Sequence, residues 1–546
     1  MKDTREGVGE FDMQLKHVSI NDFTSVRDIF WKMMPLKRDH LLKIVRDRAD
    51  ECSDKKFKSW NASHIDEALK VIIGASQFRA HTDLWSTERK GMLPPPDFGR
   101  WISKDRFTRI LRYWARGEIG IEDTLTDDPW GEVRIWVNGH NSARREEIRC
   151  GSALTPDESM IAWTGISGPG GVPHLSFLIR KPEPLGIEAK CVCDGSSGVM
   201  MYVELQEGKI RMHRKKYNDE YQHTTACTVR MLDAMKVSEK HLPEGQRLHR
   251  VVYADSWFAS RATALALRDK LGVHFTGPVK TATKGFPIEQ IRWALSKEQR
   301  GASVVFHNEE DDLYAIGWHD HQYKSYITTH GTSDEGEDAK KKRQRLDGRT
   351  YYVHVKRPKI IERYQKQMGW VDRHNRFRQD MLALHKIWTT KRWQTRLQLE
   401  LIAMAVVDTF LIARKFIPKY ATDTDEESSF RKFIVTLLSE LSQDEPQERE
   451  RDVRCFQIPT GKYTVQDGPN KGKKMTKQFC CVYCKTNKRK EVKLDGSSGS
   501  KAPRTAYSCI AHPHIHMCRK GKGTCWEEHL ADVSLGNSTE DVSFEL

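Results

Sequence analysis

Three aspartates that lie far apart in the chain stand where carboxylates could meet at one site. Asp157 in LTPDESMIAW and Asp255 in RVVYADSWFAS end runs typical of buried strands, and Asp372 in QMGWVDRHNRF lies in a segment of helical period. Hard cations such as Mg²⁺ take oxygen ligands and usually bind a few carboxylates together with substrate phosphates. Two such ions about 4 Å apart can activate an attacking oxygen and stabilise a leaving one at phosphorus. Each aspartate alone also fits a helix cap or a solvated strand end, because Asp usually lies at the surface.

The segment around the first two aspartates alternates between strand and helix patterns. The apolar runs on either side of DGSSG predict a hairpin, RVVYAD predicts a buried strand, and SRATALALRDKLG predicts a helix that Gly272 closes. This order predicts an α/β sheet covered by helices. Asp255 would then lie at the carboxyl edge of a central strand, where open α/β sheets generally place their sites.

The flanking segments are predicted to be helical, with one group of further strands. Residues 23–150 and 359–416 have helical period, and the strands ASVVFH, LYAIGWHD and KSYITTH form an insertion before the last helices. The run LIAMAVVDTFLIA at 401–413 contains Asp408 and is too short to span a bilayer, so a buried helix is expected. A basic helix starts after Ser103, and its cations either form a solvated face or contact phosphates: Lys104, Arg106, Arg109 and Arg112.

The overall charge points to a polyanionic partner. The 546 residues include 90 Lys and Arg against 75 Asp and Glu, which gives a formal net charge of +15. Each phosphate that a cation neutralises releases counterions and so favours binding, although RNA and membrane surfaces are negative too. The N-terminal MKDTREGVGEFD lacks the apolar core of a secretory signal. The polar loop GTSDEGEDAKKKRQRLDGR has a basic half, Lys340–Arg345, that either directs the chain to the nucleus or arises by chance in a lysine-rich protein.

Cysteine and histidine crowd together near the C-terminus. Six of the twelve cysteines lie between residues 480 and 525. The candidate zinc ligands are Cys481, Cys484, Cys509, His512, Cys518, Cys525 and His529, with His516, His514 and Cys480 competing for an eighth place. This spacing fits tetrahedral structural zinc, and the set is too large for one ion, so two cross-braced Zn²⁺ ions are expected. Nearby cations, among them Lys488 and Arg489, would allow DNA contact, whereas a RING- or PHD-like interaction module is the weaker alternative.

Taken in order, these blocks resemble the piggyBac transposase family from about residue 23 to residue 530. TPDESMIAW looks like the first catalytic block of the family, YADSWFAS like the second and MGWVDRHNRF like the third. The segments RKPEPLGIEAKCVCDGSSGVM and GWHDHQYKSYITT are similar to strands of the family, and the Cys/His segment is similar to its C-terminal cysteine-rich domain. No single block is decisive, but their shared order is highly specific.

The resemblance implies both a fold and a reaction. It implies a ribonuclease-H-like α/β core with a β-rich insertion, in which Asp157, Asp255 and Asp372 bind two Mg²⁺ or Mn²⁺ ions. Asp157 and Asp255 would bridge the ions, and Asp372 would hold the second one. The reaction would be cut-and-paste transposition through hairpin DNA, on double-stranded DNA with terminal inverted repeats and TTAA target sites, by a homodimer in the nucleus.

The domain boundaries that follow cover the whole chain. They are a flexible N-terminus 1–22, a helical dimerisation and DNA-binding domain 23–150, the first part of the core 151–280, an insertion with the basic loop 281–355, the helical completion of the core 356–420, an acidic linker 421–475, the zinc-binding domain 476–532 and a tail 533–546.

Two departures from the family pattern leave a second reading open. The family commonly has an aspartate three residues after the third catalytic one, where this chain has Asn375. Helical spacing places Asn375 on the face of Asp372, and an amide oxygen can still ligate a hard cation, so Asn375 is a candidate auxiliary ligand. The chain also starts close to the first family helix, which raises the expectation of a truncation. The alternative to an active transposase is therefore a domesticated, catalytically silent DNA-binding protein.

Overall fold

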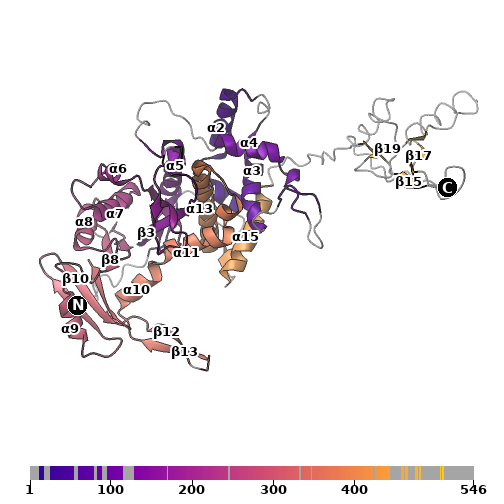
Figure 1. Cartoon of the computed structure of the whole chain (residues 1–546). Coiled ribbons are helices and arrows are strands. Elements are labelled where there is room, and N and C mark those ends of the chain that lie inside the picture. The colour runs from indigo at the N-terminus through magenta and orange to yellow at the C-terminus, as the bar shows by residue number, and fades with distance from the viewer. Residues whose placement is uncertain are drawn as a thin grey trace, which may run out of the picture. The chain divides into compact units, whose positions relative to one another are not determined.

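The computed structural model of the chain consists of two compact units, Met1–Asp444 and Glu445–Leu546 (Figure 1). In the first unit it describes residues 11–16, 25–54, 60–78, 83–88, 95–114, 128–168, 170–243, 246–330, 334–345, 347–421 and 425–442. In the second unit it describes the backbone of six short strands.

Within its described residues, the first unit is built on a nine-stranded mixed sheet. The strands are β3 (Ala153–Ala162), β4 (Ser176–Phe177), β5 (Leu185–Asp194), β6 (Met200–Leu205), β7 (Val251–Tyr253), β8 (His274–Pro278), β9 (Ser303–Asn308), β10 (Leu313–His319) and β11 (Tyr323–Thr328). Their order is β4-β5-β3-β7-β8-β11-β10-β9, and β6 pairs with β5. Strands β3, β7 and β8 are parallel neighbours, whereas the other pairs are antiparallel. The predicted α/β class is therefore confirmed.

The strands that carry the first two aspartates form where the sequence predicts them. The DGSSG turn joins β5 to β6, and the Asp194 carboxylate accepts hydrogen bonds from the backbone N–H groups of Ser196 and Ser197, each at 3.0 Å. Gly198 closes this turn with a φ of 80°, a conformation that glycine adopts without steric cost. Helices α7 (His223–Ala234) and α8 (Arg261–Leu271) follow, and Gly272 ends α8 as predicted with a φ of 68°.

A long buried helix, α13 (Trp393–Phe416), holds the helical part of the first unit together. Every residue from Thr395 to Ala413 is buried, as expected for the apolar run at its centre. Helices α1 (Val26–Met33) and α5 (Gly131–Glu147) pack directly against it. Among the described residues, no helix combines the length and the apolar character that crossing a bilayer requires.

The predicted helical domain 23–150 shares its core with the rest of the first unit. Its other helices are α2 (Arg38–Glu51), α3 (Ala62–Gly74) and α4 (Lys104–Trp114), and Ser103 caps α4 as predicted, through the N–H of Arg106 at 3.3 Å. One continuous cluster of buried apolar side chains runs from Met13 to Leu441. The smaller elements are β1 (Gln14–Leu15), β2 (Ile148–Arg149), α6 (Lys209–His213), α9 (Ile288–Leu295), α10 (Lys359–Gln367), α11 (Trp370–Arg376), α12 (Leu384–Ile387) and α14 (Pro418–Ala421).

The predicted linker 421–475 starts too early, because it contains a helix of the first unit. Helix α15 (Glu426–Glu440) packs against α1 and α3 and buries Phe430, Phe433 and Leu437. At its end, Glu440 accepts a hydrogen bond from the Ser25 hydroxyl at 2.7 Å. The acidic residues around this helix indicated a linker, but the apolar face of the helix is covered by the core.

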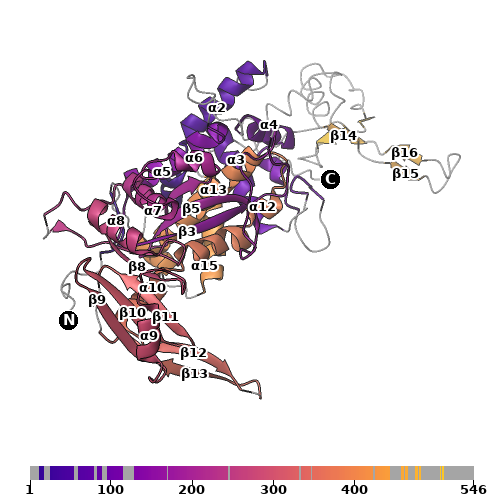
Figure 2. The same cartoon turned by 60° about the vertical axis from the view of Figure 1, so that its left-hand side comes forward.

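The insertion also differs from expectation. Strands β9, β10 and β11 extend the core sheet through the pairing of β11 with β8, and α9 covers them (Figure 2). The segment predicted as a basic loop is a hairpin made of β12 (Ala339–Gln344) and β13 (Thr350–Val355). Six cross-strand pairs from Ala339↔Val355 to Gln344↔Thr350 satisfy the backbone of this charged segment, which its composition alone did not predict.

The second unit contains three antiparallel strand pairs. They are β14 (Gln457–Pro459) with β19 (Tyr507–Cys509), β15 (Lys462–Thr464) with β16 (Lys474–Thr476), and β17 (Phe479–Cys480) with β18 (Arg504–Thr505). Of the predicted zinc ligands, Cys509 is the last residue of strand β19. Those outside the described residues are Cys481, Cys484, His512, His516, Cys518, Cys525 and His529, together with the predicted DNA-contacting Lys488 and Arg489.

Candidate active site

Asp157 and Asp255 meet where strand β7 ends beside the middle of the parallel strand β3. Asp157 lies on β3, and Asp255 follows the end of β7, which pairs with β3 through Leu154↔Val252. Oxygen atoms of Asp157, Glu158 and Asp255 all lie within 4.8 Å of one another, and the first two side chains are buried. The structure thus brings two of the predicted aspartates together and adds Glu158.

Glu158 was not selected from the sequence, where only the aspartate of the Asp–Glu pair was taken as a site residue. Neighbouring residues of a strand normally point to opposite faces, so the sequence pattern favoured one member of the pair. The signal that could have identified Glu158 is a second carboxylate in an otherwise apolar strand, because an acidic side chain is almost never fully buried unless it is paired.

Asp372 lies at the rim of this cluster. It sits on α11, which packs against β3, and its side chain is 68% exposed. The Lys181 ammonium joins it to the cluster, with Nζ at 3.3 Å from Asp372 Oδ1 and 3.7 Å from Glu158 Oε1. The structure therefore connects the third predicted aspartate to the other two through a lysine.

Cations surround the carboxylates. Arg180 forms an ion pair with Glu158 and lies 3.9 Å from Asp255 Oδ2 through its Nη1 atom. Lys190 Nζ lies 3.7 Å from Glu158 Oε2 and 3.8 Å from the centre of a ring of Trp257. Arg180 and Lys181 belong to the RKP sequence between β4 and β5, which the sequence analysis matched to the family as a block but did not assign to the site.

Burial governs the protonation of Asp157. Burial, helped by the neighbouring carboxylates of Glu158 and Asp372 and opposed by Lys181, raises the pKa of Asp157 to about 7. Glu158 Oε2 is buried and accepts no hydrogen bond. A buried carboxylate oxygen without a hydrogen bond is costly, and here the Lys190 ammonium at 3.7 Å is its counter-charge. An all-oxygen set with these properties fits a hard divalent cation such as Mg²⁺.

Asn375, the candidate auxiliary ligand, is hydrogen-bonded to the protein. Its Oδ1 accepts from the Ser159 hydroxyl at 2.9 Å and from the guanidinium of Arg378. Because a guanidinium only donates, the amide must turn its oxygen toward Arg378. Asn375 therefore ties α11 to β3 two residues beyond Asp157, and a role as a metal ligand stays a prediction.

Behind this contact a buried polar network continues to α13. Arg378 Nε donates to His374 Nδ1 at 3.0 Å, and His374 Nε2 lies 3.1 Å from Asp408 Oδ1. Asp408 also accepts from Arg144 Nε at 3.1 Å and from the backbone N–H of Met200 at 2.8 Å. Burial works against its charge, but Arg144 and His374 outweigh burial and hold the pKa of Asp408 well below its usual value.

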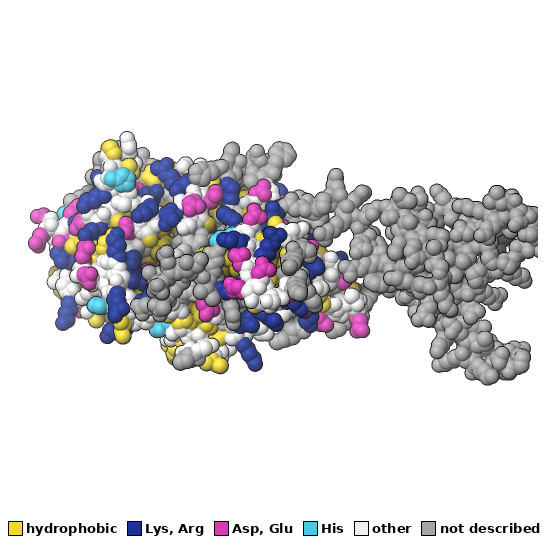
Figure 3. All heavy atoms as spheres, turned by 90° about the horizontal axis from the view of Figure 1, so that it is seen from above, with side chains coloured by type: hydrophobic (Ala, Val, Ile, Leu, Met, Phe, Trp, Pro, Cys, Tyr) yellow, Lys and Arg dark blue, Asp and Glu magenta, His cyan; other side chains and the backbone are white. Residues whose placement is uncertain are grey.

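The basic residues predicted on α4 are only partly free to contact DNA. Arg109 is held by Asp54, with Nη1 to Oδ2 at 2.6 Å, and by Asp105. Lys104, Arg106 and Arg112 are exposed. Across the face of the first unit shown in Figure 3, Lys and Arg side chains alternate with Asp and Glu. DNA contact by the exposed α4 cations stays a prediction.

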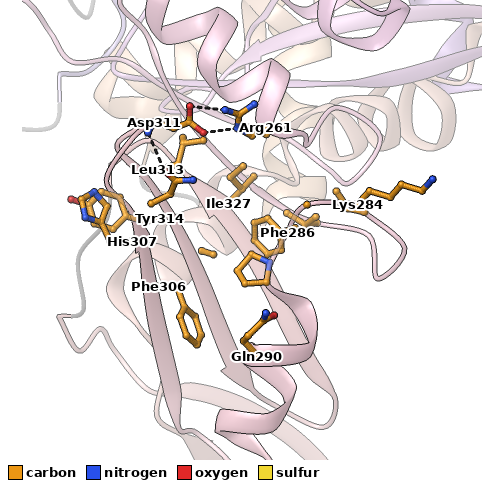
Figure 4. Close-up of a pocket in the computed structure, with 16 residues that line it drawn as sticks. Arg261, Lys284, Phe286, Gln290, Phe306, His307, Asp311, Leu313, Tyr314 and Ile327 are labelled. Carbon is orange, nitrogen blue, oxygen red and sulfur yellow. Dashed lines mark hydrogen bonds and ion pairs between the residues drawn. The ribbon is translucent and has the colours of Figure 1, made fainter.

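Two cavities lie near these elements. A cavity of about 500 Å³ adjoins the carboxylates and is lined by Arg180, Lys181, Asp372 and Asn375, among others. A second cavity, of about 540 Å³, lies in the insertion between α9 and strands β9–β11, with the Arg261–Asp311 ion pair at one end (Figure 4). The predicted aspartates do not line the second cavity. Of these aspartates, Asp372 lines the first cavity, so the candidate site adjoins that cavity.

The fold agrees with the comparison with known families and solved structures. The family model described as Transposase IS4 matches residues 28–410, and the chain belongs to this family. In fold, the chain is similar to the piggyBac transposase in a cryo-EM structure of its synaptic complex with hairpin DNA, with a TM-score of 0.57 and 15% sequence identity over 81% of this chain and 86% of that one. A comparison with curated protein sequences gave no match. The predicted resemblance to the piggyBac transposase family is confirmed.

Proposed function

We propose that the chain is a DNA transposase that cuts and joins DNA by phosphoryl transfer at the cluster of Asp157, Glu158, Asp255 and Asp372. The observation that carries this proposal is the approach of the Asp157, Glu158 and Asp255 oxygens to within 4.8 Å of one another, in a chain of a transposase family. We assign strands β6-β5-β3-β7-β8 to a ribonuclease-H-like core, since only β5 runs against the other four.

The cluster fits two divalent cations, Mg²⁺ or Mn²⁺, as the cofactor. Asp157 and Asp255 would be ligands of both ions, and Glu158 would lie beside them. Asp372 would be a ligand of the second ion. When bound, such ions supply an activated attacking oxygen and stabilise the leaving oxygen at phosphorus. The Glu158 oxygen that lacks a hydrogen bond supports this assignment.

The chain's own cations would contact the substrate. Arg180 and Lys181 neutralise Glu158, Asp255 and Asp372 in the free protein, and both line the cavity beside them. When other positive charge balances the carboxylates, these two side chains are free to turn to the phosphates of a DNA strand in that cavity. Lys190 stays packed over Trp257 and would keep Glu158 in place.

The substrate that we propose is double-stranded DNA with terminal inverted repeats, joined to target DNA at TTAA. The net charge of +15 supports a polyanionic partner, and the solved relative is a complex with hairpin DNA. Action as a homodimer, a nuclear location and a second unit held by two Zn²⁺ ions belong to the same proposal. They are supported by the family resemblance, the basic stretch Lys340–Arg345 and the Cys/His spacing of the second unit.

The second candidate function is DNA binding without catalysis. Asn375 favours this silent function. It stands where the family commonly has a carboxylate, and its amide oxygen is already hydrogen-bonded to Ser159 and Arg378. In a catalytically silent protein, the carboxylates would remain paired with Arg180 and Lys181 and would bind no catalytic metal.

A strand-cleavage assay separates these two functions. The purified full chain is incubated with labelled duplex DNA that carries the element's terminal repeat next to TTAA, with Mg²⁺, with Mn²⁺ or with a chelator. We expect metal-dependent nicking that Asp255→Asn abolishes. Asp380→Asn removes an exposed carboxylate that lines the cavity beside the cluster, and this variant should retain the nicking activity. If the parent binds this DNA but never nicks it, the silent function is the correct one.

A further inference from the structure

The β12–β13 hairpin, residues 339–355, is a basic ribbon with no role in the site described above. It contains six Lys and Arg residues and one Asp. The base of the ribbon is anchored: Ala339 and Val355 are buried, and Lys341 Nζ lies 3.0 Å from Asp320 Oδ2. The strands pair only with each other among the described residues.

Strand alternation divides the charges of the ribbon between two faces. Lys341 is on the anchored face, whereas Lys340 and Lys342 lie on the other face, opposite His354 and Tyr352. Both lysines are exposed, and within the described residues neither forms an ion pair. Tyr352 beside them is 59% exposed. One face of the ribbon is therefore cationic, aromatic and open.

The ribbon is also rooted in the strands of the candidate active site. Ala339 and Val355 belong to the buried cluster that contains Ala153 of β3 and Tyr253 of β7. From this root the ribbon extends away from the helices that surround the core, as both views of the fold show (Figures 1 and 2). A partner held by the ribbon would thus be held at a fixed position relative to the carboxylates.

We propose that this ribbon binds duplex DNA through its phosphates. A two-stranded ribbon fits the major groove of B-DNA, and an isolated two-stranded sheet is only marginally stable without a partner or further packing. The exposed cations Lys340 and Lys342 match the negative charge along the groove edges, and the half-buried Arg343 on the neighbouring face adds a third positive charge to the ribbon. This proposal rests on the proposed function for the identity of the partner, but it assigns a DNA contact to residues outside the site.

Salt-dependent binding to the full chain tests the ribbon. Fluorescence anisotropy is measured at several salt concentrations with chelator present, on a duplex with the terminal repeat and on a shuffled duplex. The variant Lys340→Gln/Lys342→Gln/Arg343→Gln should weaken binding to both duplexes about equally. Its slope of log affinity against log salt should be shallower by about two to three, because each phosphate contact contributes about 0.9.

The matched control removes the same charge from exposed cations that already have acidic partners. Lys270, Arg292 and Arg431 pair with Glu220, Glu289 and Glu427 respectively. Replacing these three cations by Gln should leave the slope within about half a unit of the parent value. Circular dichroism of both triple variants checks that each is folded.

The outcomes separate DNA binding by the ribbon from nuclear import and from a failure of the proposed function. An unchanged slope and affinity in the ribbon variant would overturn the DNA contact. If that variant loses only nuclear accumulation in cells, the basic stretch serves import instead. The failure of the proposed function has a different signature, since a parent chain that never nicks DNA can still show the ribbon-dependent slope.

Discussion

At the residue scale, the candidate site concentrates charges that oppose one another. Asp157 and Glu158 are buried, and Asp255 and Asp372 lie close enough to share the cations Arg180 and Lys181 between them. In the proposed function, the carboxylates would exchange these protein partners for a divalent cation, and Arg180 and Lys181 would turn to phosphates of the DNA. Such an arrangement costs stability in the free protein, as strained functional sites commonly do.

Asp157 should therefore make stability depend on pH when no divalent metal is present. Its pKa is about 7 in the folded chain and about 4 in the unfolded chain. The stability linked to this group is complete below about pH 4 and is lost as pH rises through 7. With chelator present, Asp157→Asn should raise the unfolding temperature relative to the parent more at pH 8 than at pH 5.

The matched control for this measurement is Asp380→Asn, which removes an exposed carboxylate that lines the adjoining cavity and should show no such difference between the two pH values. An unfolding temperature for Asp157→Asn that differs from the parent equally at pH 5 and pH 8 would contradict the assigned protonation.

Asn375 should contribute more to the stability of the fold than to metal binding. Asn375→Ala leaves the buried Arg378 guanidinium and the Ser159 hydroxyl without their shared acceptor, which should cost about 1–3 kcal/mol in the free energy of unfolding. Asn375→Asp keeps the acceptor and adds an ion pair with Arg378, so stability should be retained. Urea unfolding of both variants measures this, and equal losses in the two would show that the acceptor is unimportant.

At the element scale, Asp408 joins four elements at one buried point. Its carboxylate contacts Arg144 of α5, His374 of α11 and the backbone of Met200 in β6, while Asp408 itself belongs to α13. This contact fixes the helix that carries Asp372 to the central helix and the sheet. In the sequence alone, Asp408 served only as a reason against a membrane span.

Asp408→Asn should strongly destabilise the first unit. The Arg144 guanidinium is fully buried, and removing its charged partner leaves an uncompensated charge that should cost about 3–5 kcal/mol. The unfolding midpoint in urea checks this expectation. Asp311→Asn, which breaks an ion pair with the exposed Arg261, should cost no more than about 1 kcal/mol.

The elements themselves were predictable where local pattern and burial agree. Strand β7, helix α8 with its Gly272 end and the buried part of α13 follow from periodicity and turn residues alone. Strand β12 was missed, and the amphipathic helix of α15 was assigned to a linker, because their charged neighbours resemble loop and linker sequences. Their packing partners are distant in the chain. For the same reason the sequence placed Asp157 and Asp255 near each other but left out Glu158, Arg180 and Lys181, whose roles arise only from packing.

At the scale of the whole molecule, the two units should depend on different sources of stability. The first unit has one continuous apolar core, whereas the second is predicted to depend on zinc. The purified full chain should contain about two zinc ions, and Cys481→Ser/Cys484→Ser should lower that number in elemental analysis.

In buffer free of Mg²⁺ and Mn²⁺, zinc removal by a chelator should leave the thermal transition of the first unit at its original temperature. A shift of that transition on chelation would show that the two units stabilise each other. A metal-free second unit in the purified chain would contradict the zinc assignment itself.

The packing of α1 against α13 and α15 has a consequence for synthesis of the chain. A ribosome releases α1 first and α15 several hundred residues later, yet these helices share one core. A chain that stops within the insertion carries Asp157 and Asp255 but lacks α11, α13 and their buried contacts. Premature termination should therefore yield fragments without an assembled carboxylate cluster, because that cluster is complete only once nearly the entire first unit has been translated.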